Sequence, residues 1–412
     1  MVHHIKNPGY EIMKIIVFYQ YFCTPKGSWS TRIYELTRRW VKEGHQVTVV
    51  TAPYEKSDIV ASGFISNQVI DGINIKVINS SDSNRVSKVK RAYSAIKFAL
   101  VASYFGLTAK YDVLISSSGP ITVGIPLLLA KTIRRKKCVF EIRDLWPDGG
   151  IEAGLIKNKT VIKLLKWFER KCYSSAEVIV TASEGQTNHI KASHPDFIVE
   201  TIPNASDNEL FSSNLVNKDV SNKDKIVLSH IGSIGLLHNV KYWIDLATRF
   251  MNSDYSQKFI FRFIGDGADR KPLEALAKER RLTNVEFIGL VPKDDLPLWL
   301  SNSDATIFAT LDNPVQDTCS PNKIFDSFAA GKPIIQTSKG WIKDLVEQEC
   351  CGLNISLDDI EHSFNSVVEF CLNQELLLES GLNAKRMAES KFDRGRLAYK
   401  YLDILTDITK ES

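Results

Sequence analysis

The chain alternates short apolar runs with segments of helical periodicity, and this alternation constrains its fold more than any other feature. Lys14–Phe18 and Gln46–Thr51 have the length and the β-branched content of buried strands. Between them, Thr31–Lys42 has apolar residues at helical spacing and is followed by Gly44, a residue type suited to end a helix. Strand, helix and strand in this order form a βαβ unit, which requires a parallel sheet.

The alternation stops near residue 205 and begins again with a strand expected at Lys225–His230. A chain of 412 residues is too long for one hydrophobic core. We therefore expect an α/β protein with two doubly wound Rossmann-like domains that face each other across a cleft. The expected parts are a flexible leader (1–12), an N-terminal domain (13–205), a C-terminal domain (206–390) and a last helical segment (391–412).

The stretch 317–335 combines a polar loop, one short helix and a Gly-Lys-Pro turn that leads into a buried strand. The helix is expected to begin near Ser320 or Pro321, where a hydroxyl cap or a first-turn proline suits the free backbone N–H groups. A helix N-terminus beside Lys323 is suited to bind phosphate. Asp326, one turn further, is placed to hold the ribose hydroxyls of the same nucleotide. An ordinary capped helix with a surface ion pair is the alternative interpretation.

Polar or glycine-containing loops follow several expected strands, and ligands of open α/β sheets bind at such carboxyl ends. In the first half they form a loop with Gly27 and Ser28, a Ser-Ser-Ser-Gly-Pro loop and an Arg-Asp-Leu-Trp-Pro loop. In the second half, a Gly-Ser-Ile-Gly turn before a helix could approach a diphosphate closely. Arg143 and Asp144 are candidates for sugar or phosphate contacts, although a tryptophan packed under a turn explains that loop equally.

Charge is unevenly distributed along the chain. Residues 1–205 contain 28 Lys and Arg against 17 Asp and Glu, whereas residues 206–412 contain 24 against 31. Leu155–Tyr173 alternates basic residues with aliphatic and aromatic ones, which is typical of a helix on an anionic bilayer surface. A core helix with a solvated charged face explains the same pattern, and both interpretations stay open. No nucleic-acid motif accompanies the basic residues, so nucleic acid is not expected as a partner.

The sequence also indicates which classes of protein to exclude. Its 7 cysteines form no CxxC pair, which argues for a reducing compartment and against a disulfide framework or a structural zinc. No run of about 20 apolar residues is present, so no membrane span is expected. No apolar segment precedes Met13, so no signal peptide is expected. No metal is expected either, because no paired acids stand on a suitable loop.

Several motifs occur in an order that resembles a known family. They are RDLWP at 143–147, PNASD at 203–207, GSIG at 232–235, GDGAD at 265–269 and SPNKIFDSFAAGKP at 320–333. This order is similar to that of retaining nucleotide-sugar glycosyltransferases of family 4, which have the GT-B fold. Within the family, the chain most resembles the branch that builds bacterial O-antigen and capsule repeat units.

The resemblance implies roles for individual residues. Lys323 would be the cation for the nucleotide diphosphate. From their place in the loop rather than from the resemblance, Asp144 and Arg143 are added as catalytic candidates, with Asp144 expected to orient the acceptor hydroxyl. The implied donor-binding residues are Gly232, Ser233, Gly235, Gly265, Asp266, Gly267, Leu290, Ser320, Pro321, Asn322, Lys323 and Asp326. The first-loop and acceptor residues would be Gly27, Ser28 and Ser118, and the last helix would cross back onto the N-terminal domain.

The chain departs from the family pattern at three places. Thr318 stands where the family has the first of two glutamates. No arginine or lysine follows the GSIG turn at the usual distance, and His238 and Lys241 are the nearest substitutes. The histidine that many members carry in the N-terminal domain is also missing.

The activity implied by the resemblance is metal-independent and cofactor-independent transfer of a sugar from a UDP-sugar, with retention of configuration. The expected sugar is an N-acetylated hexose, and the expected acceptor is an undecaprenyl-diphosphate-linked saccharide. The protein would then be cytoplasmic and attached peripherally to the inner face of the membrane through Leu155–Tyr173. The alternatives are a nucleotide-sugar-binding protein without transferase activity and a GT-B sugar-nucleotide epimerase.

Overall fold

The computed structural model describes residues 11–83, 86–205, 208–212 and 224–410 and divides the chain into two compact units. Unit 1 combines the residues up to Pro203 with the segment that begins at Arg394, and unit 2 runs from Asn204 to Asp393. These boundaries lie within three residues of the expected ones at 205 and 390. Most of the expected leader, 1–12, lies outside the described residues.

The described part of unit 1 contains an eight-stranded sheet in the order β3-β4-β2-β1-β5-β6-β7-β8. Neighbouring strands are parallel except for β3, which pairs antiparallel with β4. The central strands are buried along nearly their whole length, as a parallel sheet covered on both faces requires. The strands are β1 (Lys14–Phe18), β2 (Gln46–Thr51), β3 (Ile65–Ile70), β4 (Ile73–Ile78), β5 (Val113–Ser117), β6 (Lys137–Ile142), β7 (Val178–Thr181) and β8 (Val199–Thr201).

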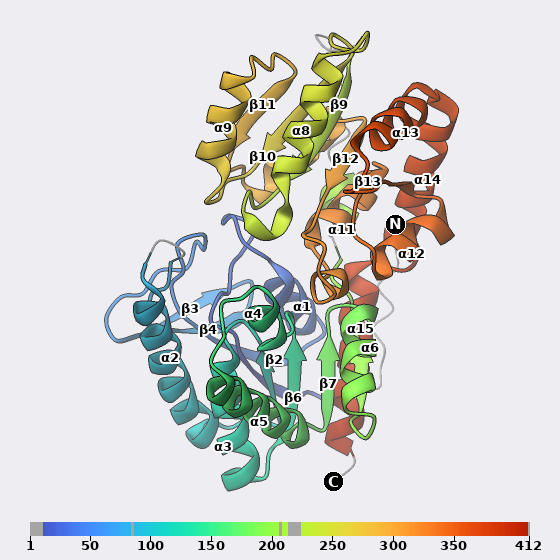
Figure 1. Ribbon diagram of the computed structural model, residues 1–412. Coiled ribbons are helices and arrows are strands. Elements are labelled where there is room, and N and C mark those ends of the chain that lie inside the picture. The colour runs from blue at the N-terminus through green and yellow to red at the C-terminus, as the bar shows by residue number, and fades with distance from the viewer. Residues whose placement is uncertain (1–10, 84–85, 206–207, 213–223, 411–412) are drawn as a thin grey trace. The chain divides into compact units, whose positions relative to one another are not determined.

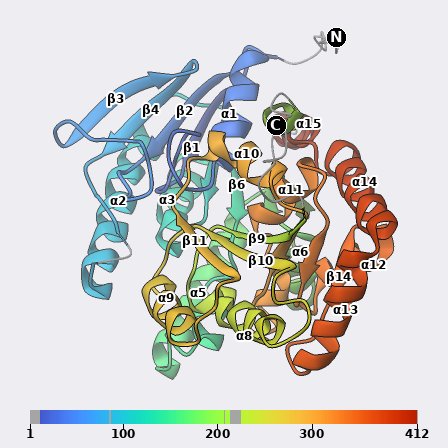
Figure 2. The ribbon, with the colours of Figure 1, turned by 90° about the horizontal axis from the view of Figure 1, so that it is seen from above.

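Helices cover both faces of this sheet (Figures 1 and 2). One face carries α1 (Arg32–Lys42) and α15 (Arg394–Lys410), and the other carries α2 (Lys88–Thr108), α3 (Gly124–Arg134) and α5 (Lys159–Ser175). Trp40 links α1 to α15, because its indole N–H donates to the carbonyl oxygen of Ala398 at 3.0 Å and its ring meets Tyr401 edge-on. The last helix is therefore part of unit 1. The shorter elements are η1 (Ile121–Val123), α4 (Asp148–Glu152) and α6 (Glu184–Ser193).

Unit 2 contains, within its described residues, a six-stranded parallel sheet in the order β11-β10-β9-β12-β13-β14. The strands are β9 (Ile226–Ile231), β10 (Phe259–Ile264), β11 (Val285–Gly289), β12 (Ala305–Phe308), β13 (Ile334–Gln336) and β14 (Gly352–Asn354). The helices are α7 (Asn208–Ser212), η3 (Leu236–His238), α8 (Val240–Met251), α9 (Arg270–Glu279), η4 (Lys293–Asp295), α10 (Leu296–Ser301), η5 (Gln316–Thr318), α11 (Asn322–Ala329), α12 (Trp341–Glu349), α13 (Ile360–Leu372) and α14 (Gln374–Ser390). Two parallel α/β sheets flanked by helices confirm the predicted fold class.

The starts of two helices compare differently with their predictions. The basic helix begins at Lys159 rather than at Leu155, because Asn158 caps it: the side-chain oxygen accepts from the backbone N–H of Thr160 at 2.9 Å. The helix expected to begin near Ser320 or Pro321 begins at Asn322, and Pro321 is the residue that precedes it. The hydroxyl of Ser320 is buried and has no hydrogen-bond partner in the described part of the chain.

Candidate functional site

Two glycine turns of unit 2 pack against each other at the carboxyl ends of β9 and β10. The backbone N–H of Ile234 donates to the carbonyl oxygen of Asp266 at 3.1 Å. A Cβ on Gly265 would lie 1.8 Å from the carbonyl oxygen of Gly232. Likewise, a Cβ on Gly267 would lie 2.1 Å from that of Ile234. The backbones therefore approach so closely that both positions require glycine.

The same turns leave room for a ligand at one position. Gly235 has an extended backbone, and no heavy atom lies within 4 Å of the place where its Cβ would be. Asp266 is half-buried, and its carboxylate accepts from the backbone N–H of Gly267 at 2.8 Å. This contact fixes the second turn and occupies one of the two carboxylate oxygens of Asp266.

Lys323 extends from the first turn of α11 toward the first glycine turn. Its ammonium nitrogen lies 3.7 Å from where a Cβ of Gly232 would be and 5.5 Å from the centre of the Phe308 ring. This nitrogen is buried and has no hydrogen-bond partner among the described residues. Burial lowers the pKa of Lys323 from 10.5 to about 7. A buried ammonium without a hydrogen-bond partner among the described residues is suited to bind an anionic ligand.

One histidine near Lys323, His230, was not recognised as a site residue from the sequence. His230 is the last residue but one of β9 and is fully buried, and its Nε2 donates to the carbonyl oxygen of Ser233 at 3.2 Å. Burial, followed by the charges of Lys323 and His238, lowers the pKa of His230 well below its ordinary value. The rings of His230 and His238 are 6.5 Å apart. Because His230 reads as part of an apolar strand, only its place before the GSIG turn could have indicated its role.

Asp326 has a partner that the sequence did not reveal. Its Oδ2 forms an ion pair with the ammonium of Lys293 from η4, and both side chains are largely buried. Its Oδ1 is buried and has no hydrogen-bond partner in the described structure. The ion pair thus anchors one carboxylate oxygen and leaves the other able to accept from a hydroxyl. No pattern links residues 33 positions apart, so the sequence could not predict this pair.

The other predicted donor residues lie at the ends of neighbouring elements of unit 2. Pro321 and Asn322 begin α11, and the carbonyl oxygen of Ser320 accepts from the side-chain amide of Asn204 at 2.5 Å. Leu290 follows β11 and is 53% exposed. It comes directly after Gly289, whose φ of 103° favours glycine.

In unit 1, Arg143 is held in place by several contacts. Its guanidinium lies 4.7 Å from the centre of the Tyr19 ring and donates from Nη2 to the hydroxyl of Ser30 at 2.7 Å. The hydroxyl of Ser118 accepts from the backbone N–H of Arg143 at 2.9 Å. The remaining nitrogen, Nη1, is buried and has no hydrogen-bond partner in the described residues. Ser118 is therefore committed to positioning Arg143, which retains one donor for a ligand.

Asp144 and the first loop have different environments. The Asp144 side chain is exposed, yet desolvation by the surrounding protein raises its pKa, and Arg143 opposes this effect. Gly27 is buried, and its Cβ would lie 2.3 Å from the sulfur of Cys23 and 2.9 Å from the carbonyl oxygen of Lys56. The backbone N–H of Ser28 donates to the same oxygen at 2.9 Å. Gly27 and Ser28 thus have a structural role in closing the loop.

Arg32 and Glu141 form a buried ion pair that was not predicted from the sequence. Arg32 Nε donates to Glu141 Oε1 at 2.9 Å, and the hydroxyl of Ser117 donates to Glu141 Oε2 at 2.5 Å. The guanidinium of Arg32 also donates to the carbonyl oxygens of Ile202 and Pro203, both at 2.8 Å. The pair therefore ties α1 and β6 to the segment after β8.

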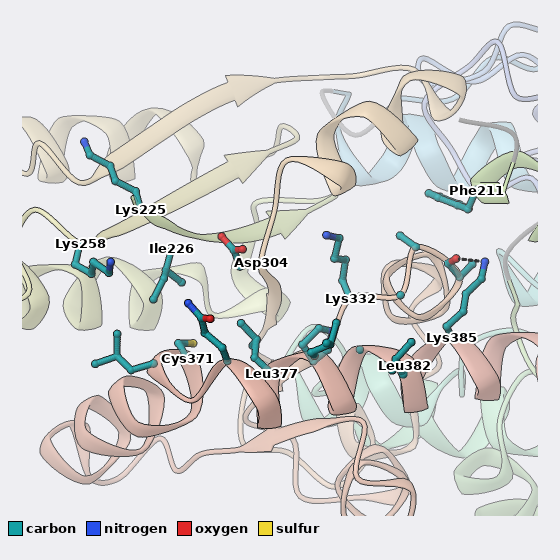
Figure 3. A pocket seen from close by; sticks show the side chains of 18 of the residues that line it. Phe211, Lys225, Ile226, Lys258, Asp304, Lys332, Cys371, Leu377, Leu382 and Lys385 are labelled. Carbon is teal, nitrogen blue, oxygen red and sulfur yellow. Dashed lines mark hydrogen bonds between the residues drawn. The ribbon is translucent and has the colours of Figure 1, made fainter. Parts of the chain in front are cut away.

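A cavity of about 730 Å³ in unit 2 lies at the opposite edge of the sheet from the glycine turns (Figure 3). Its lining includes Lys225 and Ile226 where β9 begins, Asp304 just before β12 and Lys332 just before β13. The predicted donor residues lie at the carboxyl ends of these strands and do not line this cavity. The volume of this cavity therefore does not indicate that the donor binds in it.

The described residues contain no group of three or more histidine, cysteine, aspartate or glutamate side chains arranged to hold a metal ion. Among the helices described, none is both long enough and apolar enough to span a bilayer.

Two family models match the chain. The model described as "Glycosyl transferase 4-like domain" matches residues 29–205, and "Glycosyl transferases group 1" matches residues 226–373. A probable glycosyltransferase, WbjE of Pseudomonas aeruginosa, is 24% identical over 63% of this chain and 66% of its own length. An Escherichia coli UDP-Gal:alpha-D-GlcNAc-diphosphoundecaprenol alpha-1,3-galactosyltransferase is 23% identical over 61% of this chain and 66% of its own length. The match thus spans slightly less than two thirds of either relative.

Solved structures resemble the whole chain. The structure of HepE from Anabaena in complex with UDP and glucose aligns with a TM-score of 0.67, at 15% identity over 96% of this chain and 99% of that one. Such a likeness shows a shared GT-B architecture. The chain therefore belongs to the glycosyltransferases of the 4-like and group 1 type, with the first domain in unit 1 and the second in unit 2.

Proposed function

We propose that this protein is a retaining glycosyltransferase of bacterial O-antigen or capsule synthesis. In this proposal it transfers a sugar, an N-acetylated hexose by hypothesis, from a UDP-sugar to an undecaprenyl-diphosphate-linked saccharide. The observation that carries the proposal is Lys323, a buried ammonium without a hydrogen-bond partner among the described residues, next to the glycine turns of β9 and β10. A desolvated cation of this kind is costly to the folded protein unless a ligand compensates it.

The donor diphosphate would lie in the open space at Gly235. There it could receive charge-assisted contacts from Lys323 and from backbone N–H groups in the first turn of α11. The ribose hydroxyl would donate to Oδ1 of Asp326, while Lys293 keeps the carboxylate in position. UDP is supported as the nucleotide by the donor in the name of the E. coli relative and by the UDP complex of HepE.

The proposed reaction breaks the bond between the anomeric carbon and the diphosphate oxygen and forms a bond to the acceptor oxygen on the same face. The acceptor proton passes to the departing phosphate oxygen, so the atoms balance. Lys323 and the α11 N–H groups stabilise the negative charge that develops on the leaving diphosphate. Because these groups supply the positive charge, neither a metal nor a cofactor is required. Asp144 would orient the acceptor hydroxyl, and the remaining donor of Arg143 would bind an oxygen of the sugar or phosphate.

The acceptor class follows from the E. coli relative, whose name contains a diphosphoundecaprenol substrate. A lipid-linked acceptor places the enzyme at the inner face of the cell membrane. The outward side of α5 suits this, because Val161, Leu164 and Trp167 are 43%, 61% and 57% exposed among lysines. Lys166 is unsuited to contact lipid, since it pairs with Asp148 at 2.6 Å and with Glu169 at 3.0 Å.

The test is a thermal-shift panel of UDP, GDP, ADP and CMP on the full chain, repeated with Lys323→Met. Ligands that bind the folded state raise the melting temperature by mass action. We expect a shift with UDP that Lys323→Met abolishes and that Lys241→Met preserves. Lys241 is a matched control, because it lies on α8 of the same unit and its ammonium pairs with Asp245. No shift with any nucleotide would refute the donor site.

Transfer is tested separately from binding. The full chain is incubated with UDP-N-acetylglucosamine, UDP-N-acetylgalactosamine or UDP-glucose and a synthetic prenyl-diphosphate-linked acceptor, and UDP release is followed. We expect acceptor-dependent release with an N-acetylated donor. A shift with UDP without any release would favour a binding protein, and conversion of the UDP-sugar without acceptor would favour an epimerase.

A further inference from the structure

Helix α2 carries an exposed apolar stripe along most of its length. Its members recur every three or four residues and therefore share one side of the helix. They are Val89, Tyr93, Ile96, Leu100 and Tyr104, which are 80%, 67%, 48%, 61% and 60% exposed. The opposite side of α2 is also apolar and is buried against unit 1, as Phe98 and Phe105 show. Single exposed apolar residues are ordinary, but five in line on one helix mark an interaction surface.

The charges of α2 are all of one sign. Its sequence contains Lys88, Lys90, Arg91 and Lys97 and no acidic residue. Three of these cations stand in the first turn, where the helix dipole disfavours positive charge by about 0.3–1 kcal/mol each. Two of the cations have partners within the protein: Arg91 lies 3.6 Å from the carboxylate of Asp82, and Lys97 donates to the carbonyl oxygen of Asn79 at 2.6 Å. Lys90 is exposed to solvent, where it can attract an anionic partner.

The stripe belongs to a layer of three adjacent helices. Both views show α2, α3 and α5 side by side on one face of the unit 1 sheet (Figures 1 and 2). Helices α3 and α5 pack closely, since a Cβ on Gly124 would lie 2.3 Å from the sulfur of Cys172. Ile133 on α3 is 63% exposed, and α5 adds its own outward apolar residues and lysines. Neither α2 nor α3 contains an acidic residue, and the one acid of α5, Glu169, is buried and pairs with Lys166.

We propose that the exposed stripe of α2 docks on an anionic lipid surface. Its aliphatic and tyrosine side chains would enter the headgroup region while Lys90 contacts anionic headgroups. A second copy of this chain fits less well, because pairing two α2 helices along the stripe would bring rows of like charge together. This inference extends the membrane contact of the proposed function from α5 to α2. It gives the enzyme a two-helix platform beside a lipid-linked acceptor.

The test is co-sedimentation of the full chain with vesicles of phosphatidylcholine, with and without phosphatidylglycerol. The variant is Tyr93→Ser with Leu100→Ser, and the matched control is Leu378→Ser with Leu382→Ser on α14, whose side chains are similarly exposed. We expect binding to the anionic vesicles to fall by roughly tenfold in the α2 variant and to stay unchanged in the control. Lys90→Glu should also lower binding, and added salt should weaken binding of the unmodified chain.

Several outcomes would overturn the inference. They are equal binding of the α2 variant and its control, equal binding to neutral and anionic vesicles, or a dimer in solution that the α2 variant dissolves. The thermal shift with UDP, measured on the same variants, separates this inference from the proposed function. The protein could bind vesicles through α2 and yet show no change of melting temperature with any nucleotide. That result would refute the donor site but would support the lipid-binding surface on α2.

Discussion

Donor binding should weaken as the pH rises through 7, because Lys323 must be protonated to attract the diphosphate. Burial lowers its pKa to about 7, and no acidic group opposes this. If only the protonated form binds, affinity for UDP-glucose falls about tenfold between pH 6 and pH 8. UDP-glucose is the better probe, since it lacks the terminal phosphate monoester of UDP, which itself titrates near pH 6.

The assay is isothermal calorimetry of UDP-glucose binding from pH 6 to pH 9 in buffers of different ionisation heat. Near pH 7 the complex should take up about half a proton, because the bound diphosphate raises the pKa of Lys323. Lys323→Arg supplies a cation that stays charged throughout this range and should remove both the slope and the proton uptake.

Two neighbouring groups could contribute to the same slope and need controls. His230 stays neutral over this pH range, because burial and the nearby Lys323 lower its pKa well below the ordinary value. His238 is tested directly, and His238→Gln should leave the slope in place. An affinity for UDP-glucose that does not change between pH 6 and pH 8 would refute the reasoning, as would a slope that persists in Lys323→Arg.

The remaining predictions concern stability and the glycine turns. In the unfolded chain Lys323 has its ordinary pKa of 10.5, so the unfolded state binds more protons between pH 7 and 10.5 and stability rises with pH there. Lys323→Met should therefore stabilise the nucleotide-free protein at pH 7 by up to about 5 kcal/mol, whereas Lys241→Met should not; urea unfolding measures both. Gly265→Ala should prevent folding or cost several kcal/mol, because its Cβ would lie 1.8 Å from a backbone oxygen. Gly235→Ala should leave the melting temperature within a degree or two but weaken UDP-glucose binding in calorimetry, because its methyl group would enter the open space. Arg32→Met should cost about 3–5 kcal/mol in urea unfolding, because it leaves the buried Glu141 without its ionic partner, and Arg32→Met with Glu141→Gln should recover part of that loss.

The sequence predicts the buried parallel strands best. The bounds expected for β1 and β2 agree with the structure, because a strand covered on both faces must be apolar without interruption. β3 is the counterexample: it forms an exposed edge hairpin with β4, and its mixture of polar and apolar residues resembles a loop. Local composition thus predicts elements whose burial is uniform and misses those at an edge.

The stripe of α2 shows a second limit. Both sides of this helix are apolar, so its sequence reads as an ordinary buried helix and periodicity cannot separate the side against the sheet from the side in solvent. Only the fold shows that Tyr93 and Leu100 point outward while Phe98 points inward. An interaction surface built from apolar residues is for this reason harder to predict from sequence than a glycine turn.

The ion pair between Asp326 and Lys293 explains why Lys323 has no hydrogen-bond partner among the described residues. Asp326 is the acid nearest in sequence to Lys323 on α11, yet its Oδ2 is bound by Lys293 instead. Were Asp326 to pair with Lys323, the ammonium would be neutralised by the protein, and a diphosphate would have to break that pair in order to bind. Lys293, which lies 33 residues before Asp326 in the sequence, pairs with this carboxylate, so Asp326 does not compete with a diphosphate for Lys323. An anion-binding site benefits from this arrangement. Asp326 is paired with Lys293, so Lys323 remains available to bind the diphosphate.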